Sequence, residues 1–271
     1  MSVFPYVPLE QRPWRLAMGL RPLEESKWLE VDARRNEELA LKRRLVNEQR
    51  DTVVAVREAG EAASHELLDL VLENLATYHP HVARDVASSE HPIVQASLLV
   101  QEDLCVLVHD GQWRLEAACV CFPSRWSLVH KIGTTLDDIH VPVPGYDEEL
   151  AQPTNAFFGR LKPERSFWRL NWTLLDDATL HQPSSRRQPA RGGPDQWFFR
   201  VERQTLRLLP VSRAAVFTIR TYVASVQQLR NEHEDFADNL LAALDSAPSA
   251  IKAYKGWEGV ADQLRVALAR S

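Results

Sequence analysis

The chain has 271 residues, of which 45% are apolar and 25% charged, and its formal net charge is −5. This composition is ordinary for a globular protein, and it excludes a collagen-like, low-complexity or wholly disordered chain. The charge balance gives no support for nucleic-acid binding, which needs a basic excess. A chain of this length buries about 70% of its unfolded surface, enough for a core that encloses a ligand.

Cysteine usage and hydropathy indicate the cellular compartment. Only Cys105, Cys119 and Cys121 are present, too few for a disulfide scaffold or a four-cysteine iron–sulfur cluster. Cys119 and Cys121 lie in an apolar strand pattern and are expected to be buried packing residues. No apolar run approaches the ~18 residues of a membrane span, and prolines interrupt the N-terminal region where a signal peptide is apolar. We therefore expect a cytoplasmic protein without membrane contact.

The first third of the chain predicts an arm and then helices. Residues 1–30 are rich in proline and tryptophan and are expected to lie over the core as an extended arm, with Trp14 and Trp28 as packing anchors. Residues 32–78 predict two helices. The first is charged, covers 32–58 and ends near Gly60, and the second is capped by Ser64 and carries a leucine-rich face.

Residues 98–223 predict the sheet core. Two apolar runs flank Asp110-Gly111, a strong hairpin signal. Thr134 or Thr135 is expected to cap a short helix, which the prolines at 142 and 144 stop before a turn at Gly145. Alternating patterns predict three more strands, over 168–174, 198–208 and 216–223, with a loop at 181–196.

The order of the predicted elements gives the fold class. Residues 224–271 predict two C-terminal helices separated near Pro248. Strands that follow one another, rather than alternate with helices, favour an α+β fold with an antiparallel sheet. No internal repeat or linker is visible, so we expect one domain over residues 1–271, with helical N- and C-terminal extensions.

Histidine offers the first functional signal. The sequence contains no P-loop, no G-x-G-x-x-G fingerprint, no G-x-S-x-G elbow and no zinc-binding spacing. His140 follows an amphipathic turn and precedes Val-Pro-Val-Pro-Gly, which mounts its imidazole rigidly. Because imidazole serves both as a metal ligand and as a structural hydrogen-bonding group, both roles remain open for His140. The pair His79-Pro-His81 is more typical of a surface loop.

Polar residues alternate along the three later strands, and they either line a pocket or form a solvated face, because alternation does not say which face meets water. The triplets are Arg169/Asn171/Thr173, Arg200/Glu202/Gln204 and Thr218/Arg220/Tyr222.

Five motifs in a fixed order give the sequence a family resemblance. They are K-I-G at 131–133, I-H-x-P-V-P-G at 139–145, R-x-N-W at 169–172, R-V-E-R-Q-T-L at 200–206 and F-T-I-R-T-Y at 217–222. Each motif alone is weak, but the ordered set is specific. From about residue 13 to about residue 257, the chain resembles the heme-dependent oxidative N-demethylase family.

This resemblance implies a PAS-like core that binds heme b and activates dioxygen at iron. The implied reaction oxidises an N-methyl group of a small methylated amine, such as dimethylamine, and releases formaldehyde and the demethylated amine. His140 lies in the strongest motif and inherits the role of axial iron ligand, with His130 and His79 as the alternatives. Lys131 and Arg125 precede His140 closely and are expected to pair with the heme propionates.

Catalytic roles on the polar strands follow from the same resemblance. Glu202 is expected to receive the cationic amine or relay protons, while Arg220 and Tyr222 donate hydrogen bonds near bound oxygen. The structural alternative is that Glu202 and Arg220 form a cross-strand ion pair. The rival functions are a non-enzymatic PAS-like heme sensor or redox module, and a scaffold that has lost heme.

The implied reaction also needs an electron source. Oxidative demethylation consumes two electrons per dioxygen, yet the sequence has no flavin or nicotinamide fingerprint. We therefore expect electrons from NAD(P)H to arrive through a separate flavin and iron–sulfur reductase. The loop at 181–196, with Arg186, Arg187 and Arg191, is a candidate docking surface for it, and a solvated loop is the alternative.

Overall fold

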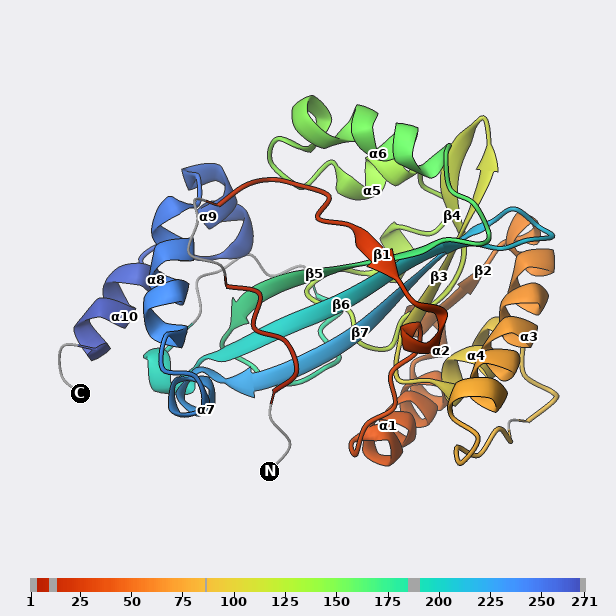
Figure 1. The fold of residues 1–271 in the computed structure, drawn as a ribbon, viewed down its shortest axis with the longest axis horizontal. Coiled ribbons are helices and arrows are strands. Elements are labelled where there is room, and N and C mark those ends of the chain that lie inside the picture. Colours follow the sequence, from red (N-terminus) through yellow and green to blue (C-terminus); the bar gives the residue numbers. More distant parts are fainter. Residues whose placement is uncertain (1–3, 10–13, 86, 185–190, 269–271) are drawn as a thin grey trace.

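The computed structural model describes residues 4–9, 14–85, 87–184 and 191–268. These residues form one seven-stranded antiparallel sheet with helices packed around it (Figure 1), which confirms the predicted α+β class. The strand order is β1-β5-β6-β7-β3-β4-β2. The strands are β1 (Arg21–Leu23), β2 (Val54–Val56), β3 (Asp103–Asp110), β4 (Gln112–Cys119), β5 (Ser166–Leu175), β6 (Phe198–Leu208) and β7 (Ala215–Ser225).

Helices cover the sheet in three groups (Figure 1). One face packs against α1 (Arg35–Glu48), α2 (Arg50–Val53), α3 (Glu61–Tyr78) and α4 (Pro92–Leu99). The opposite face packs against α5 (Leu136–His140), the π-helical turn η4 (Tyr146–Leu150) and α6 (Ala151–Phe158). The C-terminal group comprises α7 (Val226–Glu232), α8 (Phe236–Ser246), α9 (Ser249–Lys255) and α10 (Val260–Leu268). Short 3-10 turns are η1 (Glu25–Lys27), η2 (Glu58–Gly60), η3 (Leu128–His130) and η5 (Pro194–Gln196).

Two local sequence signals produce the predicted structure. The β3–β4 hairpin turns at Gly111, whose φ of 74° is a conformation that glycine adopts without steric cost. Helix α5 starts with a capping box. The Thr135 hydroxyl accepts a hydrogen bond from the Asp138 backbone N–H at 3.1 Å, and the Asp138 carboxylate accepts one from the Thr135 N–H at 3.3 Å. The prediction of a helix capped by Thr135 is confirmed.

The helical prediction for residues 32–58 is wrong at its C-terminal end. Helix α1 ends at Glu48, and residues 54–56 form an edge strand paired with β4. Gly60 precedes α3 and lies against β4, where a Cβ atom would be 2.6 Å from the Glu116 carbonyl oxygen. Ser64 is not a cap but lies inside α3, where its hydroxyl donates to the Gly60 carbonyl at 2.8 Å. Helices α4 and α6 were not expected, and each half of the predicted C-terminal pair contains two helices.

The strand register decides which side chains share a face of the sheet. Residues directly opposite in an antiparallel ladder point to the same side. Glu202 is opposite Asn171 and Thr221, whereas Arg203 is opposite Arg220. Glu202 and Arg220 therefore point to opposite sides. We call the side with Arg169, Asn171, Arg200, Glu202 and Gln204 the Glu202 face, and the side with Arg203, Arg220 and Tyr222 the Arg220 face.

Several packing predictions are confirmed. Trp28 is fully buried against the α1–α3–α4 layer, as expected of an anchor in the arm. Cys105, Cys119 and Cys121 are buried free cysteines.

Among the described residues, no helix has the length and apolar character needed to span a bilayer.

Candidate functional site

The Glu202 face carries a buried polar cluster where β5 and β6 run side by side. Glu202 is only 8% exposed, and Arg200 is fully buried. The Glu202 carboxylate accepts hydrogen bonds from Asn171 Nδ2 at 3.3 Å and Gln204 Nε2 at 3.0 Å, and Arg200 Nε lies 3.8 Å from it. Burial at Arg200 and Glu202 excludes a solvated face at these positions.

Arg200 is held by the protein itself. Its guanidinium donates to the Phe122 carbonyl at 2.5 Å and to the Leu180 carbonyl at 3.1 Å. These bonds tie the segments before and after the β5 strand to the sheet. Burial lowers the pKa of Arg200, while the carboxylates of Glu202 and Asp103 act in the opposite direction. Its main visible role is therefore structural.

Lys255 joins this cluster from α9. Strand β1 pairs only with Ser166–Trp168, so the rest of the outer edge of β5 has no strand neighbour among the described residues. Lys255 Nζ binds at that edge, donating to the Trp172 carbonyl at 2.6 Å and to Asn171 Oδ1 at 3.2 Å. Burial lowers the pKa of Lys255 to about 8. Nothing in the sequence pattern marked this lysine.

Arg169 is the least satisfied cation of the Glu202 face. Its Nε atom is buried and has no hydrogen-bond partner among the described residues. Burial lowers its pKa, and the nearby Glu202 carboxylate acts in the opposite direction. A buried N–H donor without a partner is costly unless a ligand satisfies it. Arg169 is thus a candidate binding group, although the sequence analysis gave it no separate role.

His140 lies at the C-terminal end of α5, whose Ile139 packs in one apolar cluster with Phe167 and Leu206 of the Glu202 face. Its Nδ1 is 2.7 Å from the Leu136 carbonyl, and its ring stacks on Tyr146 with centroids 4.6 Å apart. Because a carbonyl only accepts, Nδ1 carries the proton and Nε2 keeps its lone pair. No described residue donates a hydrogen bond to Nε2.

The electrostatic environment keeps this imidazole neutral. Burial lowers the pKa of His140, and the positive charges of Arg169 and Lys131 act in the same direction, against the Leu136 hydrogen bond. Proteins present a histidine to a metal in this way, with one ring N–H anchored to a carbonyl and the other nitrogen free. The donor set at His140 therefore fits an axial heme ligand.

The other two candidate histidines have a different setting. His130 is exposed on η3. His79 follows α3, and its Nε2 hydrogen-bonds to the Leu29 carbonyl at 3.2 Å. The anchored ring nitrogen of His79 is Nε2 rather than Nδ1, so His79 has the mirror-image arrangement. His140 differs from both rings in following Ile139, which packs against the Glu202 face.

The two residues expected to meet the propionates are already bonded within the protein. Arg125 pairs with Asp176 at 2.5 Å and donates to Gln182 Oε1 at 3.3 Å. Its φ of 59° is unusual for a residue with a side chain. Lys131 Nζ donates to the Ile139 carbonyl at 2.7 Å and so braces the end of α5 beside His140.

Arg220 and Tyr222 lie on the Arg220 face, away from Glu202. Arg220 pairs with Asp32 at 2.7 Å and Glu38 at 2.8 Å, and the Tyr222 hydroxyl donates to Glu30 at 2.5 Å. These bonds fasten the N-terminal arm and α1 to the sheet. The alternative of a Glu202–Arg220 cross-strand ion pair is wrong, because the register points the two side chains to opposite sides.

The segment 14–20 links the two helical groups that flank the free edge of β5 (Figure 1). The Trp14 backbone N–H donates to Ser246 Oγ of α8 at 3.0 Å. At its other end Leu16 approaches Gly145, where a Cβ atom would be 3.4 Å from Leu16 Cδ2. Gly145 has a φ of 79° and ends the turn that carries His140. The site therefore combines five segments of the chain, which are residues 14–20, α5, β5, β6 and α9.

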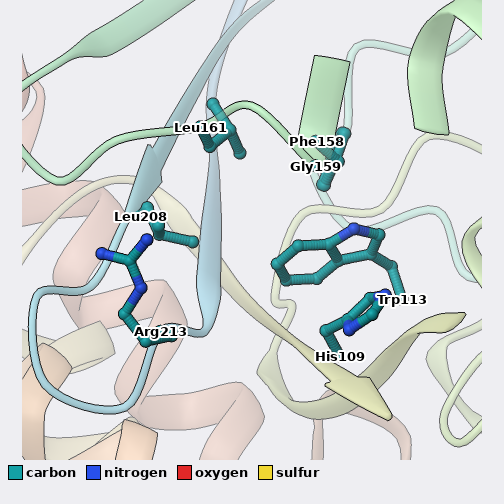
Figure 2. Close-up of a pocket in the computed structure, with 7 residues that line it drawn as sticks. All are labelled: His109, Trp113, Phe158, Gly159, Leu161, Leu208 and Arg213. Carbon is teal, nitrogen blue, oxygen red and sulfur yellow. The ribbon is translucent and has the colours of Figure 1, made fainter. Parts of the chain in front are cut away.

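Figure 2 shows a separate pocket between the β3–β4 hairpin and the end of α6. Its volume of about 230 Å³ is below the roughly 300 Å³ of a typical ligand pocket. None of the predicted site residues lines it; the lining residues are His109, Trp113, Phe158, Gly159, Leu161, Leu208 and Arg213. We therefore place the candidate site at the Glu202 face instead.

Iron within a porphyrin needs only one or two protein ligands. The described residues contain no group of three or more His, Cys, Asp or Glu side chains arranged to hold a bare metal ion. This finding leaves the heme prediction untouched, since a single histidine such as His140 suffices.

The comparison with known families covers nearly all of the elements described above. A family model described as "Haem-dependent oxidative N-demethylase, alpha subunit-like" matches residues 19–84 and 81–265. The second range contains His140, Arg169, Glu202 and Lys255. The chain therefore belongs to the haem-dependent oxidative N-demethylase, alpha subunit-like family.

Proposed function

We propose that this chain is a heme b-dependent monooxygenase subunit that demethylates a small methylated amine, such as dimethylamine, and releases formaldehyde. The observation that carries the proposal is His140, a neutral imidazole with an anchored Nδ1–H and a free Nε2 beside the buried polar cluster. Family membership supports the same chemistry. We also propose that residues 1–271 form one heme-binding domain with a PAS-like core, supported by a β3–β4 hairpin that pairs with the last strand of the β5–β6–β7 meander.

Heme, when bound, would supply iron for dioxygen binding and activation. His140 Nε2 would bind the iron, and the Leu136 carbonyl and the Tyr146 ring would fix the orientation of the imidazole. The overall reaction converts the N-methyl amine, dioxygen, two electrons and two protons into the demethylated amine, formaldehyde and water. One oxygen atom of dioxygen enters formaldehyde and the other leaves as water. The electrons come from NAD(P)H through a separate flavin and iron–sulfur reductase.

Glu202 is the proposed amine-binding group. A methylated amine is a cation at neutral pH, and a buried carboxylate gives it a charge-assisted hydrogen bond. Asn171 and Gln204 hold this carboxylate in place. Its oxygen also provides an acceptor for the proton that leaves the ammonium before oxidation.

The proposal is tested by reconstitution and product analysis. The purified protein is titrated with heme, and the loaded protein is then given dimethylamine, dioxygen, NADH and a flavin and iron–sulfur reductase. We expect a Soret band and formaldehyde in proportion to amine consumed. A Soret band without formaldehyde from any methylated amine would favour a heme sensor. No Soret band would exclude both heme functions.

A further inference from the structure

We infer that Arg169 and Lys255, and not Arg125 and Lys131, hold the two carboxylates of the heme. The inference rests on the proposed function, because it takes heme b as the ligand. It assigns a carboxylate-binding role to one residue of β5 and one of α9, two elements that meet at the free edge of the sheet.

The first argument is the charge balance of the Glu202 face. The described residues of this cluster include three cations, Arg169, Arg200 and Lys255, and the carboxylate of Glu202, while Asp103 on the same side of the sheet acts on Arg200. Burying a cation without a partner is unfavourable, so such cations are normally paired or bind an anion. With Glu202 and Asp103 counted, the cations still exceed the carboxylates, so a ligand carboxylate would improve the charge balance, and heme b supplies two.

The second argument is which donors remain unused. Arg200 already donates to two carbonyls. Arg169 Nε is buried without a hydrogen-bond partner among the described residues, and the planar fork of a guanidinium matches the geometry of a carboxylate. Lys255 uses two of its three N–H donors, on Asn171 and Trp172, and its third has no described partner.

The third argument is position. Arg169 lies close enough to His140 for its charge to act on the imidazole, and it acts in the same way on Lys255. Lys255 is fixed further by the Trp257 ring, whose centroid is 4.9 Å from its ammonium nitrogen. Arg169 therefore lies within electrostatic reach of both His140 and Lys255. By contrast, Arg125 is bonded to Asp176 and Lys131 to Ile139.

A substrate could also supply a carboxylate, as an N-methyl amino acid does. Hemin dimethyl ester separates the two sources because it keeps the porphyrin and iron but lacks both charges. We therefore compare hemin with hemin dimethyl ester in Soret titrations of the wild type, Arg169→Met and Lys255→Met. The exposed Arg165→Met and, on the same helix as Lys255, Lys252→Met are matched controls. Circular dichroism verifies that each variant is folded. A further variant, Arg169→Lys, keeps the positive charge but lacks the planar guanidinium that can donate two parallel hydrogen bonds.

We expect each site variant to bind hemin about 10- to 100-fold more weakly, since a charge-assisted hydrogen bond contributes about 1.5–3 kcal/mol and 1.4 kcal/mol corresponds to tenfold. Arg169→Lys should lose less hemin affinity than Arg169→Met, because lysine keeps the positive charge. All proteins should bind the dimethyl ester equally, and the controls should match the wild type.

Equal losses for hemin and its ester, or no loss for either, would overturn the inference. Unchanged hemin affinity with a raised KM for an N-methyl amino acid would also overturn it, because the carboxylate would then be the substrate's. Failure of the wild type to bind either porphyrin would instead remove the proposed function itself.

Discussion

His140 presents one fixed tautomer, since the Leu136 carbonyl retains the proton on Nδ1 and the Tyr146 ring restrains rotation. We predict that His140→Ala weakens heme binding by more than about 100-fold, because losing even an outer-shell partner of a metal ligand costs about 10- to 100-fold. Free imidazole should restore part of the Soret band by filling the vacated space. The exposed His130→Ala serves as the control. A normal spectrum in His140→Ala would reassign the ligand to His130 or His79.

The amine-binding role of Glu202 can be tested with glutamine, which has nearly the same shape but no negative charge. We predict that Glu202→Gln retains heme but lowers kcat/KM for a cationic amine by about 10- to 100-fold, because one charge-assisted hydrogen bond of about 1.5–3 kcal/mol is lost. The loss should appear mainly as a higher KM. Glu164→Gln, at an exposed position, should behave as the wild type. The same KM in Glu202→Gln and the wild type would leave Glu202 a structural role only.

Lys255 gives stability a pH dependence of unusual sign. Burial lowers its folded pKa to about 8 from 10.5, so between these pH values the unfolded chain binds the extra proton. Stability therefore rises with pH in this window. The groups around Lys255 are Glu202, Arg169, Asn171 and the two tryptophan rings. We predict that the heme-free wild type gains unfolding free energy from pH 8 to 10.5 relative to Lys255→Met, measured by urea titration. A constant difference between the two proteins would refute this.

At the scale of elements, the Arg220 face fastens the N-terminal arm to the sheet. Arg220 is buried between Asp32 and Glu38, and Arg203 is paired with Glu30. Removing one partner of a buried ion pair leaves the other charges uncompensated. Because Arg220 makes these contacts, we expect its substitution to change mainly the free energy of unfolding.

We predict that Arg220→Met lowers the free energy of unfolding by about 3–5 kcal/mol, the usual cost of breaking a buried ion pair. Arg50→Met, which breaks the exposed Arg50–Glu90 pair, should cost about 0–1 kcal/mol. Urea unfolding of both variants measures the difference, and the folded Arg220→Met protein should still bind heme. Equal losses of unfolding free energy in Arg220→Met and Arg50→Met would contradict the structural role assigned to Arg220.

How far the sequence predicted these elements depended on their length and patterning. The strands β3 to β7 alternate or flank a glycine turn, so their positions were predictable. The three-residue strands β1 and β2 exist only through their pairing with β5 and β4. Helix α6 was missed because Pro153 reads as a breaker, although proline is tolerated in the first turn of a helix.

The candidate site was predictable only in part, because it depends on register and on long-range contacts. Alternation shows that Glu202 and Arg203 point to opposite sides of β6. It does not show which of them shares a side with Arg220, and a one-residue shift in pairing would reverse the answer. Lys255 was not found because its role arises only where α9 meets the free edge of β5.

At the scale of the whole molecule, the proposed docking surface is joined to the residues beside the site. Of the loop at 181–196, residues 185–190, with Arg186 and Arg187, lie outside the described residues. The Arg191 backbone N–H donates to Asp176, which also pairs with Arg125. A partner bound to this loop would therefore contact a segment bonded to the end of the strand that carries Arg169.

The last prediction concerns electrons, which the proposed reaction consumes in pairs. The sequence carries no flavin or nicotinamide fingerprint, and its family is described as alpha subunit-like. We predict that the heme-loaded chain releases no formaldehyde with NADH alone and becomes active when a flavin and iron–sulfur reductase is added. If the loop arginines guide docking, the rate at low reductase concentration should fall as salt rises, because salt screens attraction between exposed charges. Arg191→Glu should then raise the reductase concentration needed for half-maximal rate, while Arg165→Glu should not. Sustained turnover by the pure chain with NADH and dioxygen would refute the need for a partner.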